Sequence, residues 1–301
     1  MQHSNLGYGR PDNRWDTVRA VAVASEEAGL DSCWIPDHFQ YGAETPVLEC
    51  WVTLGALAAA TTRLRLGALV SGIPYRNPAL LAKMGATLDV ISHGRSIMGI
   101  GAGWHREEFD AYGYAFETAA IRGARLEEAA QVIRAMLSGP RTTFAGRHYQ
   151  VADAYNEPRP IQQPHPPLLI GGNGEKVTLR LVAQYGDMCN LTGTPGDVQR
   201  LLAILREHCR AVGRPYEEIT RTAFGWLLIG RTEEEAAAKR ARYMQREPFP
   251  GIAGTPQQVV ARLREYAAAG VQEFLFSMPD AHEMAPLRLF GEEVLPALAD
   301  V

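Results

Sequence analysis

The sequence has few cysteines and no long apolar run. Its four cysteines include no CxxC pair, which argues against a disulfide framework or a cysteine metal cluster, so we expect reduced thiols at Cys33, Cys50, Cys189 and Cys209. No apolar run approaches the roughly 18 residues of a membrane span, and residues 1–10 are too polar for a signal peptide. These absences predict a cytoplasmic protein that does not interact with a membrane.

Basic charge is scarce as well. The formal net charge is −4 and the isoelectric point is near 6.1, which gives no basic footprint for nucleic acid or an anionic membrane surface. Hydrophobic residues make up 46% of the chain and charged residues 21%, as in an average globular protein. The length of 301 residues suits one large α/β barrel or two smaller domains. We therefore expect a small-molecule partner.

Short apolar runs alternate with amphipathic stretches of helical period, which is the pattern of parallel βα units. The runs are apolar throughout, as expected for strands covered on both faces. The predicted strands are 31–36, 64–70, 95–101, 167–172, 186–191, 222–230 and 271–277. The predicted helices are 15–28, 47–60, 78–91, 120–137, 175–184, 195–212, 233–245 and 255–269.

These patterns give seven clear strands, and an eighth would have to be residues 2–6. That segment is short for a strand, and a few more apolar residues before it would make a full first strand. We therefore expect the natural chain to start earlier. Eight strands would close a (β/α)8 TIM barrel. An open, doubly wound sheet is the alternative.

One insertion, at about 138–166, interrupts the alternation between the fourth helix and the fifth strand. Its first half, with TTFAGRHYQV, predicts a short hairpin, and its second half, with NEPRPIQQPHPP, predicts a proline-rich extended segment. Neither half indicates a domain boundary. We therefore expect residues 1–301 to form a single domain.

Polar and glycine residues gather after the predicted strands, where a parallel barrel carries its catalytic residues. Asp37 and His38 follow the second strand, and this pair of an acid and an imidazole is suited to move or steer a proton near neutral pH. The alternative is a capping aspartate beside a histidine that is only hydrogen-bonded. Further candidates follow the third, fourth and fifth strands: Ser71, Gly72, Gly101, Ala102, Gly103, Trp104, Gly171, Gly172 and Asn173.

Two glycine-rich segments precede predicted helices. GGNG at 171–174 follows an apolar strand, so its N–H groups and the helix dipole could bind a phosphate, although many such turns contain glycine for steric reasons alone. The segment 251–256 is similar, with Thr255 as the expected N-cap and Pro256 as the first helical residue. An ordinary capped helix explains this second segment equally well.

Two cofactor classes are disfavoured. Gly101-Ala102-Gly103 resembles the start of a dinucleotide fingerprint, but the third glycine is missing and Trp104-His105 would crowd a pyrophosphate, so we expect no NAD-binding domain. His105 and Glu108 lack a second histidine at helical ligand spacing, and we expect no metal site.

Five segments together carry a family resemblance: WIPDHF (34–39), 45–72, YRNPALLAKMGATLDVISHGRSIMGIGAGW (75–104), 148–176 and GTPQQVVARL (254–263). They resemble the luciferase-like monooxygenase superfamily, and more narrowly its F420-dependent oxidoreductase branch. The resemblance implies a (β/α)8 barrel with a flavin or deazaflavin ring across its mouth.

The resemblance also implies roles for individual residues. Asp37 and His38 match the family's DH beside the reactive ring, where both are catalytic and cofactor-binding candidates. The resemblance implies that His38 transfers the proton or is the electrostatic partner of the reduced ring. Ser71 and Gly72 fall in the family's third-strand bulge, for which a non-prolyl cis peptide is expected within 70–72. The phosphate of the cofactor is assigned to Gly171, Gly172 and Asn173, and the neighbouring wall to Gly101, Ala102, Gly103 and Trp104.

The sequence departs from the family's sugar-phosphate dehydrogenases. Those members resemble this chain but carry an acidic proton donor where it has Trp104, and a tryptophan where it has Tyr41-Gly42. A sugar-phosphate substrate is therefore not expected. Instead Tyr41, Tyr75, Trp104 and Trp226 suggest an aromatic-lined cavity.

The function that the resemblance implies is hydride transfer between coenzyme F420 and a small organic substrate. An FMN-dependent monooxygenase that uses reduced flavin and oxygen is the alternative on the same fold. A non-catalytic barrel that binds a flavin is a second alternative. The resemblance also implies a homodimer that forms through the early helices.

Overall fold

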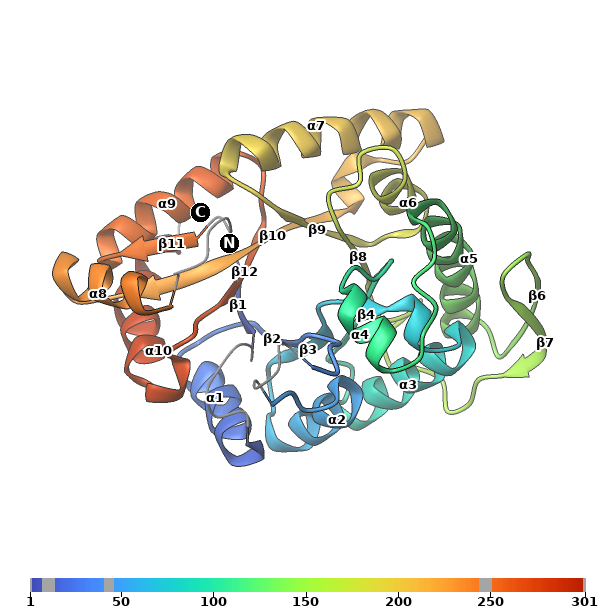
Figure 1. The fold of residues 1–301 in the computed structure, drawn as a ribbon, viewed down its shortest axis with the longest axis horizontal. Helices are drawn as coiled ribbons and strands as arrows, with labels where there is room; N and C mark the ends of the chain where they lie inside the picture. Colours follow the sequence, from blue (N-terminus) through green and yellow to red (C-terminus); the bar gives the residue numbers. More distant parts are fainter. Residues whose placement is uncertain (1, 7–13, 41–45, 244–250, 300–301) are drawn as a thin grey trace.

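The computed structural model of the protein describes residues 2–6, 14–40, 46–243 and 251–299, with the backbone alone for residues 2–6. In this part of the chain, eight parallel strands form one barrel (Figure 1). They are β1 (Gln2–Leu6), β2 (Ser32–Ile35), β3 (Arg65–Ala68), β5 (Ser96–Gly101), β8 (Leu168–Gly171), β9 (Met188–Thr192), β10 (Thr220–Ile229) and β12 (Glu273–Ser277).

The ring of strands is closed. β1 pairs with β12 over its whole length and with β2, and β10 pairs with both β9 and β12. The short segment 2–6 is therefore the first barrel strand, and the (β/α)8 prediction is confirmed. The alternative prediction of an open, doubly wound sheet is wrong, because β1 and β12 pair with each other and neither is an edge strand.

Helices surround the barrel (Figure 1), and none that the structure describes is long and apolar enough to cross a membrane. The α-helices are α1 (Trp15–Glu27), α2 (Cys50–Ala60), α3 (Pro78–Ile91), α4 (Arg106–Ala111), α5 (Ala119–Ser138), α6 (Thr178–Tyr185), α7 (Pro195–Val212), α8 (Glu233–Tyr243), α9 (Pro256–Ala268) and α10 (Ala285–Leu289). Short 3-10 turns cover Ile73–Tyr75, Tyr216–Glu218, Ala281–Glu283 and Pro296–Leu298, and a π-helical turn covers Phe290–Val294.

Most predicted helices agree with the structure to within a few residues. α2 begins at Cys50 rather than near residue 47, because the Glu49 side chain accepts the Val52 N–H as an N-cap. α4 and the edge strand β11 (Gly251–Gly254), which pairs with β10, were not predicted.

The insertion forms the predicted hairpin. β6 (Arg141–Ala145) and β7 (Gln150–Tyr155) pair antiparallel and project at the edge of the molecule beside α5 (Figure 1). The Glu128 carboxylate on α5 accepts the backbone N–H groups of Arg147, His148 and Tyr149 at 2.8, 2.8 and 2.9 Å. These bonds fix the hairpin to the outside of the barrel.

The barrel interior is filled below its mouth. Trp34, Ile97, Leu169, Met188 and Leu275 form a buried cluster inside the ring. The neighbouring strand provides space for the indole, because a Cβ at position 67, which is glycine, would lie 2.5 Å from it. A larger apolar layer lies between the strands and the helices, and it includes all four cysteines as buried residues.

Candidate active site

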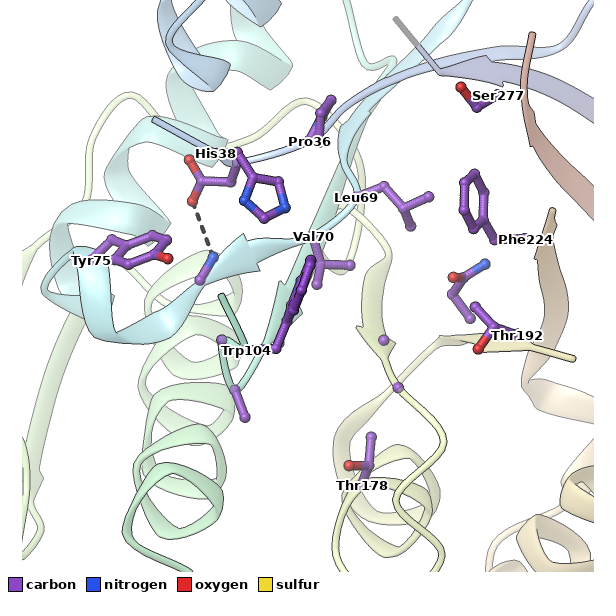
Figure 2. Close-up of a pocket in the computed structure, with 18 of the residues that line it drawn as sticks. Pro36, His38, Leu69, Val70, Tyr75, Trp104, Thr178, Thr192, Phe224 and Ser277 are labelled. Atoms are coloured by element: carbon purple, nitrogen blue, oxygen red, sulfur yellow. Dashed lines mark hydrogen bonds between the residues drawn. The ribbon is translucent and has the colours of Figure 1, made fainter. Parts of the chain in front are cut away.

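A cavity of about 570 Å³ opens at the carboxyl ends of the barrel strands (Figure 2). This is the position at which (β/α)8 barrels bind ligands, and the volume is typical of a small-molecule site. His38 and Tyr75 lie on one side and Phe224 and Ser277 on the other, with Leu69, Val70 and Trp104 between them (Figure 2).

Most of the predicted site residues meet at this cavity. Those that line it are Asp37, His38, Gly72, Tyr75, Gly101, Ala102, Gly103, Trp104, Gly171, Gly172 and Trp226. Ser71 is fully buried and accepts a hydrogen bond from the Trp51 indole at 3.1 Å. The Asn173 side chain bonds to both the hydroxyl and the backbone of Thr192, which ties the loop after β8 to the end of β9. Tyr41 lies outside the described residues.

His38 is held by a buried carboxylate. Its Nδ1 lies 2.7 Å from Oε2 of Glu108, a residue of α4 whose side chain is completely buried. The same oxygen accepts the Tyr75 hydroxyl at 3.1 Å, and Oε1 accepts the N–H groups of Phe39 and Gln40 at 2.7 and 3.2 Å. Glu108 thus joins the loops after β2, β4 and β5.

The charge on Glu108 sets the tautomer of His38. Burial opposes ionisation of Glu108, but the hydrogen bond and charge of His38 and the two backbone donors outweigh it and lower its pKa. Burial and the nearby Glu108 charge raise the pKa of Tyr75, so its hydroxyl stays protonated and donates. Since an ionised carboxylate only accepts, Nδ1 of His38 donates to Glu108, and in the tautomer of the neutral ring that fits this contact the nitrogen without a proton is Nε2.

Asp37 holds the polypeptide beside the cavity. Arg76 binds both of its carboxylate oxygens, and the Gly72 N–H donates to Oδ2 at 3.0 Å, the bond dashed in Figure 2. Arg76 also pairs with Glu49. Burial raises the pKa of Asp37 above its ordinary value, although Arg76 and the Gly72 N–H act against it. The pair therefore connects the end of β2 to the bulge after β3.

The bulge places Val70 under the cavity. A cis peptide joins Leu69 to Val70 between β3 and the two-residue strand β4 (Ser71–Gly72), one bond before the segment 70–72 in which it was expected. The Val70 side chain lies between two glycines, since a Cβ on Gly101 would approach it to 2.6 Å and one on Gly171 to 3.0 Å. Side chains larger than hydrogen at these two positions would push Val70 out of the floor.

The two glycine-rich segments differ in their surroundings. Gly171 and Gly172 line the cavity together with Thr178, the first residue of α6. The helix starts three residues later than predicted, because a turn at 175–177 separates it from GGNG and no side chain caps its start. The segment before α9 lines no part of the cavity, and Thr255 and Gln258 form a capping box there, so it is an ordinary capped helix.

His105 and Glu108 are not brought together as ligands. Among the described residues, no group of three or more His, Cys, Asp or Glu side chains could hold a metal ion. The His105 ring packs against the Trp104 ring, at 5.0 Å between centroids, whereas Glu108 bonds to His38.

The sequence analysis missed the roles of Glu108 and Arg76. Arg76 follows the strand next to the one that Asp37 follows, so opposite charges at neighbouring strand ends were an available signal. For Glu108 the signal was weaker, because its donors belong to loops after other strands and α4 has six residues.

The fold and the cavity define a (β/α)8-barrel protein whose ligand site lies at the carboxyl ends of the strands. The chain belongs to the luciferase-like monooxygenase family, whose model matches residues 1–251.

Individual relatives share most of their length with this chain. An F420-dependent glucose-6-phosphate dehydrogenase of Kineococcus radiotolerans is 33% identical, over 92% of this chain and 91% of its own. The F420-dependent tetrahydromethanopterin reductase of Methanopyrus kandleri has a TM-score of 0.84 at 22% identity, with 98% and 99% of the two chains covered. A monooxygenase of Streptomyces bottropensis has a TM-score of 0.82 at 22% identity, with 99% and 100% covered. At these identities the two structures show a common fold.

Proposed function

We propose that this protein is an F420-dependent oxidoreductase that transfers a hydride between the deazaflavin and a small organic substrate. Support comes from relatives such as the Kineococcus dehydrogenase and from one observation in the cavity. Beside a floor formed by Val70 between Gly101 and Gly171, the buried carboxylate of Glu108 accepts the Nδ1 proton of His38, and this is the tautomer in which Nε2 of the neutral ring is basic.

The residues present fit a planar ring with a phosphate-bearing tail. Gly101 and Gly171 keep the floor flat by admitting Val70 beneath it, and a ring could lie against this surface. The phosphate is assigned to the loop of Gly171, Gly172 and Asn173, in which the Asn173 side chain is bonded to Thr192 and the Gly172 N–H to the Asn190 carbonyl, so the backbone N–H of Asn173 would hold it. Ala102, Gly103 and Trp104 would form the wall, with Ser71 and Gly72 in the supporting bulge. When bound, the deazaflavin supplies a two-electron hydride acceptor or donor.

His38 is the general base and general acid of the proposed reaction. Neutral Nε2 takes a proton from a substrate hydroxyl during oxidation and returns it during reduction, while Glu108 stabilises the imidazolium that forms. Asp37 acts on the same site by fixing the bulge. Replacing His38 with Ala tests this role: we expect turnover to fall by about 100- to 10,000-fold, the usual contribution of acid–base catalysis, with cofactor binding retained. Unchanged turnover would instead favour a barrel that binds a flavin without using His38.

FMN-dependent oxygenation is the second candidate, since the family takes its name from monooxygenases and the Streptomyces monooxygenase shares the fold. Fluorescence-quenching titrations with oxidised F420 and with FMN separate the two. Micromolar or tighter binding of F420 alone supports the hydride-transfer proposal. Preferred binding of FMN would replace it with oxygenation.

The proposed assembly is a homodimer formed through α2 and α3. These helices expose apolar side chains, with Val52 75%, Leu80 55% and Ile91 45% exposed, and apolar exposure of this kind marks contact surfaces. Light scattering at micromolar concentration tests the assembly, and a monomer mass would refute it.

Two further properties belong to the proposal. Residues 1–301 form a single domain, supported by the pairing of β1 with β12, and limited proteolysis should release no stable half. The location is cytoplasmic, supported by four buried cysteines that remain thiols, and cell fractionation tests it.

A further inference from the structure

The cavity walls that face the floor are mainly apolar. Leu69, Trp104, Phe224 and Trp226 contribute to them, and Trp104 is 61% exposed. Phe224 stands across the cavity from His38, with Trp104 near the imidazole (Figure 2). Solvent-exposed aromatic side chains at a binding site favour a ligand with an apolar body, because binding of such a ligand buries apolar surface that is otherwise in contact with water.

The charges on the His38 side of the cavity oppose an anionic substrate there. The carboxylates of Asp37, Glu49 and Glu108 lie behind the His38 side, and Arg76 is already paired with two of them. Among the described residues, those that line the cavity include no lysine or arginine. A dianionic phosphate ester of a substrate placed beside His38 would therefore bring two negative charges toward these carboxylates in a partly desolvated part of the cavity, where charges of the same sign repel strongly. The phosphate of the cofactor is assigned to another part of the lining, the loop that starts at Gly171.

The polar groups on the opposite wall are neutral. Asn190 is fixed by a chain of hydrogen bonds: the Thr222 hydroxyl donates to the Cys189 carbonyl at 2.8 Å, so it accepts Nδ2 of Asn190 at 2.8 Å. Nδ2 of Asn190 therefore donates to the protein, and its carbonyl oxygen Oδ1 is the group that can accept a hydrogen bond from a ligand in the cavity. A neutral hydroxyl or N–H group suits such a position.

We propose that the substrate is an uncharged alcohol with an apolar or aromatic body, or the carbonyl compound formed from it, and not a sugar phosphate. This inference rests on the proposed F420-dependent function. In the oxidation, the hydride leaves the carbinol carbon for the bound deazaflavin and the hydroxyl proton goes to Nε2 of His38. The C–O bond becomes C=O, so the alcohol loses the two electrons that the cofactor gains.

The first experiment measures binding and turnover separately. F420 is titrated into the protein by fluorescence quenching, and calorimetry on the F420-loaded protein then compares 1-phenylethanol with glucose 6-phosphate. We expect saturable binding of 1-phenylethanol only, and a kcat/KM for it at least 100-fold above that for glucose 6-phosphate. Equal or stronger binding of glucose 6-phosphate would overturn the substrate class and leave the proposed function standing. Failure of F420 itself to bind would overturn the proposed function.

A second experiment tests the apolar wall. Trp226→Ala removes an indole from the wall that contains Phe224, and Trp15→Ala on the outer helix α1 is the matched control. We expect the dissociation constant for 1-phenylethanol to rise at least tenfold in the first variant, with F420 binding within threefold of the parent protein and the control unchanged. Unaltered alcohol binding would remove this wall from the substrate site. If Trp226→Ala does not fold, Phe224→Leu provides the same comparison.

Discussion

Replacing Glu108 with Gln tests the arrangement that makes His38 basic. In the structure, Oε1 accepts two backbone N–H groups and Oε2 accepts His38 and Tyr75. The two backbone donors cannot change, so the single amide oxygen of Gln must stay with them. The amide NH2 then faces His38, whose Nδ1 must accept. The proton of the neutral imidazole moves to Nε2, which can no longer take a proton from a substrate.

The size of the effect follows from these contacts. Loss of the basic nitrogen removes the acid–base contribution, so we expect kcat to fall by about 100- to 10,000-fold. Loss of charge-assisted hydrogen bonds to a buried acceptor should lower the free energy of unfolding by about 2 kcal/mol. Cofactor binding should change little, since Glu108 does not line the cavity.

The assay follows the loss of deazaflavin fluorescence during turnover, with a separate F420 titration and a denaturant melt. The matched control is Glu107→Gln, because Glu107 is the neighbouring acid on the same helix and its side chain is 78% exposed. The reasoning would be refuted if Glu108→Gln kept kcat within twofold of the control while both variants bound F420 equally.

Three further predictions concern the supports of the site. Gly101→Ala places a Cβ 2.6 Å from the bulge and should weaken F420 binding at least tenfold in a quenching titration, whereas Gly55→Ala, which meets nothing within 4 Å, should bind normally and melt slightly higher. Arg76→Met leaves Asp37 as a buried charge without its cation and should cost about 3–5 kcal/mol in denaturant unfolding. Burial would raise the pKa of Glu26, but the backbone donors at 62–64 lower it to about 2. The parent protein should therefore be more stable than Glu26→Gln above about pH 5. This difference in the free energy of unfolding should disappear as the pH falls toward 2, which acid titrations of both proteins can measure.

The barrel could be predicted from the sequence because its signal is repeated. From β2 to β10, each barrel strand contains a short apolar run that is followed by a helical pattern, so an error in one unit does not change the class. The first strand, residues 2–6, was harder, because its apolar content is low and only its two neighbours identify it. Closure of the barrel depends on the pairing of β1 with β12, which are far apart in the sequence. A local sequence pattern carries no information about such a pairing.

The cavity lining was partly predictable for a related reason. Residues after parallel strands must meet at one end of the barrel, which brought His38, Trp104 and Gly171 to the same cavity. The pairing of His38 with Glu108 depends on how a six-residue helix turns back toward another loop, and neither spacing nor periodicity encodes that direction.

The way in which β1 closes the ring also affects how the chain reaches its fold. β1 is synthesised before the other barrel strands, yet its longest partner, β12, is the last barrel strand in the described part of the chain. Until β12 has been synthesised, the growing sheet keeps open edges that can pair with other chains. The final closure joins contacts that are very distant in sequence, a step that folds slowly. Cells that produce this protein quickly would therefore be expected to depend on chaperones that shield those edges.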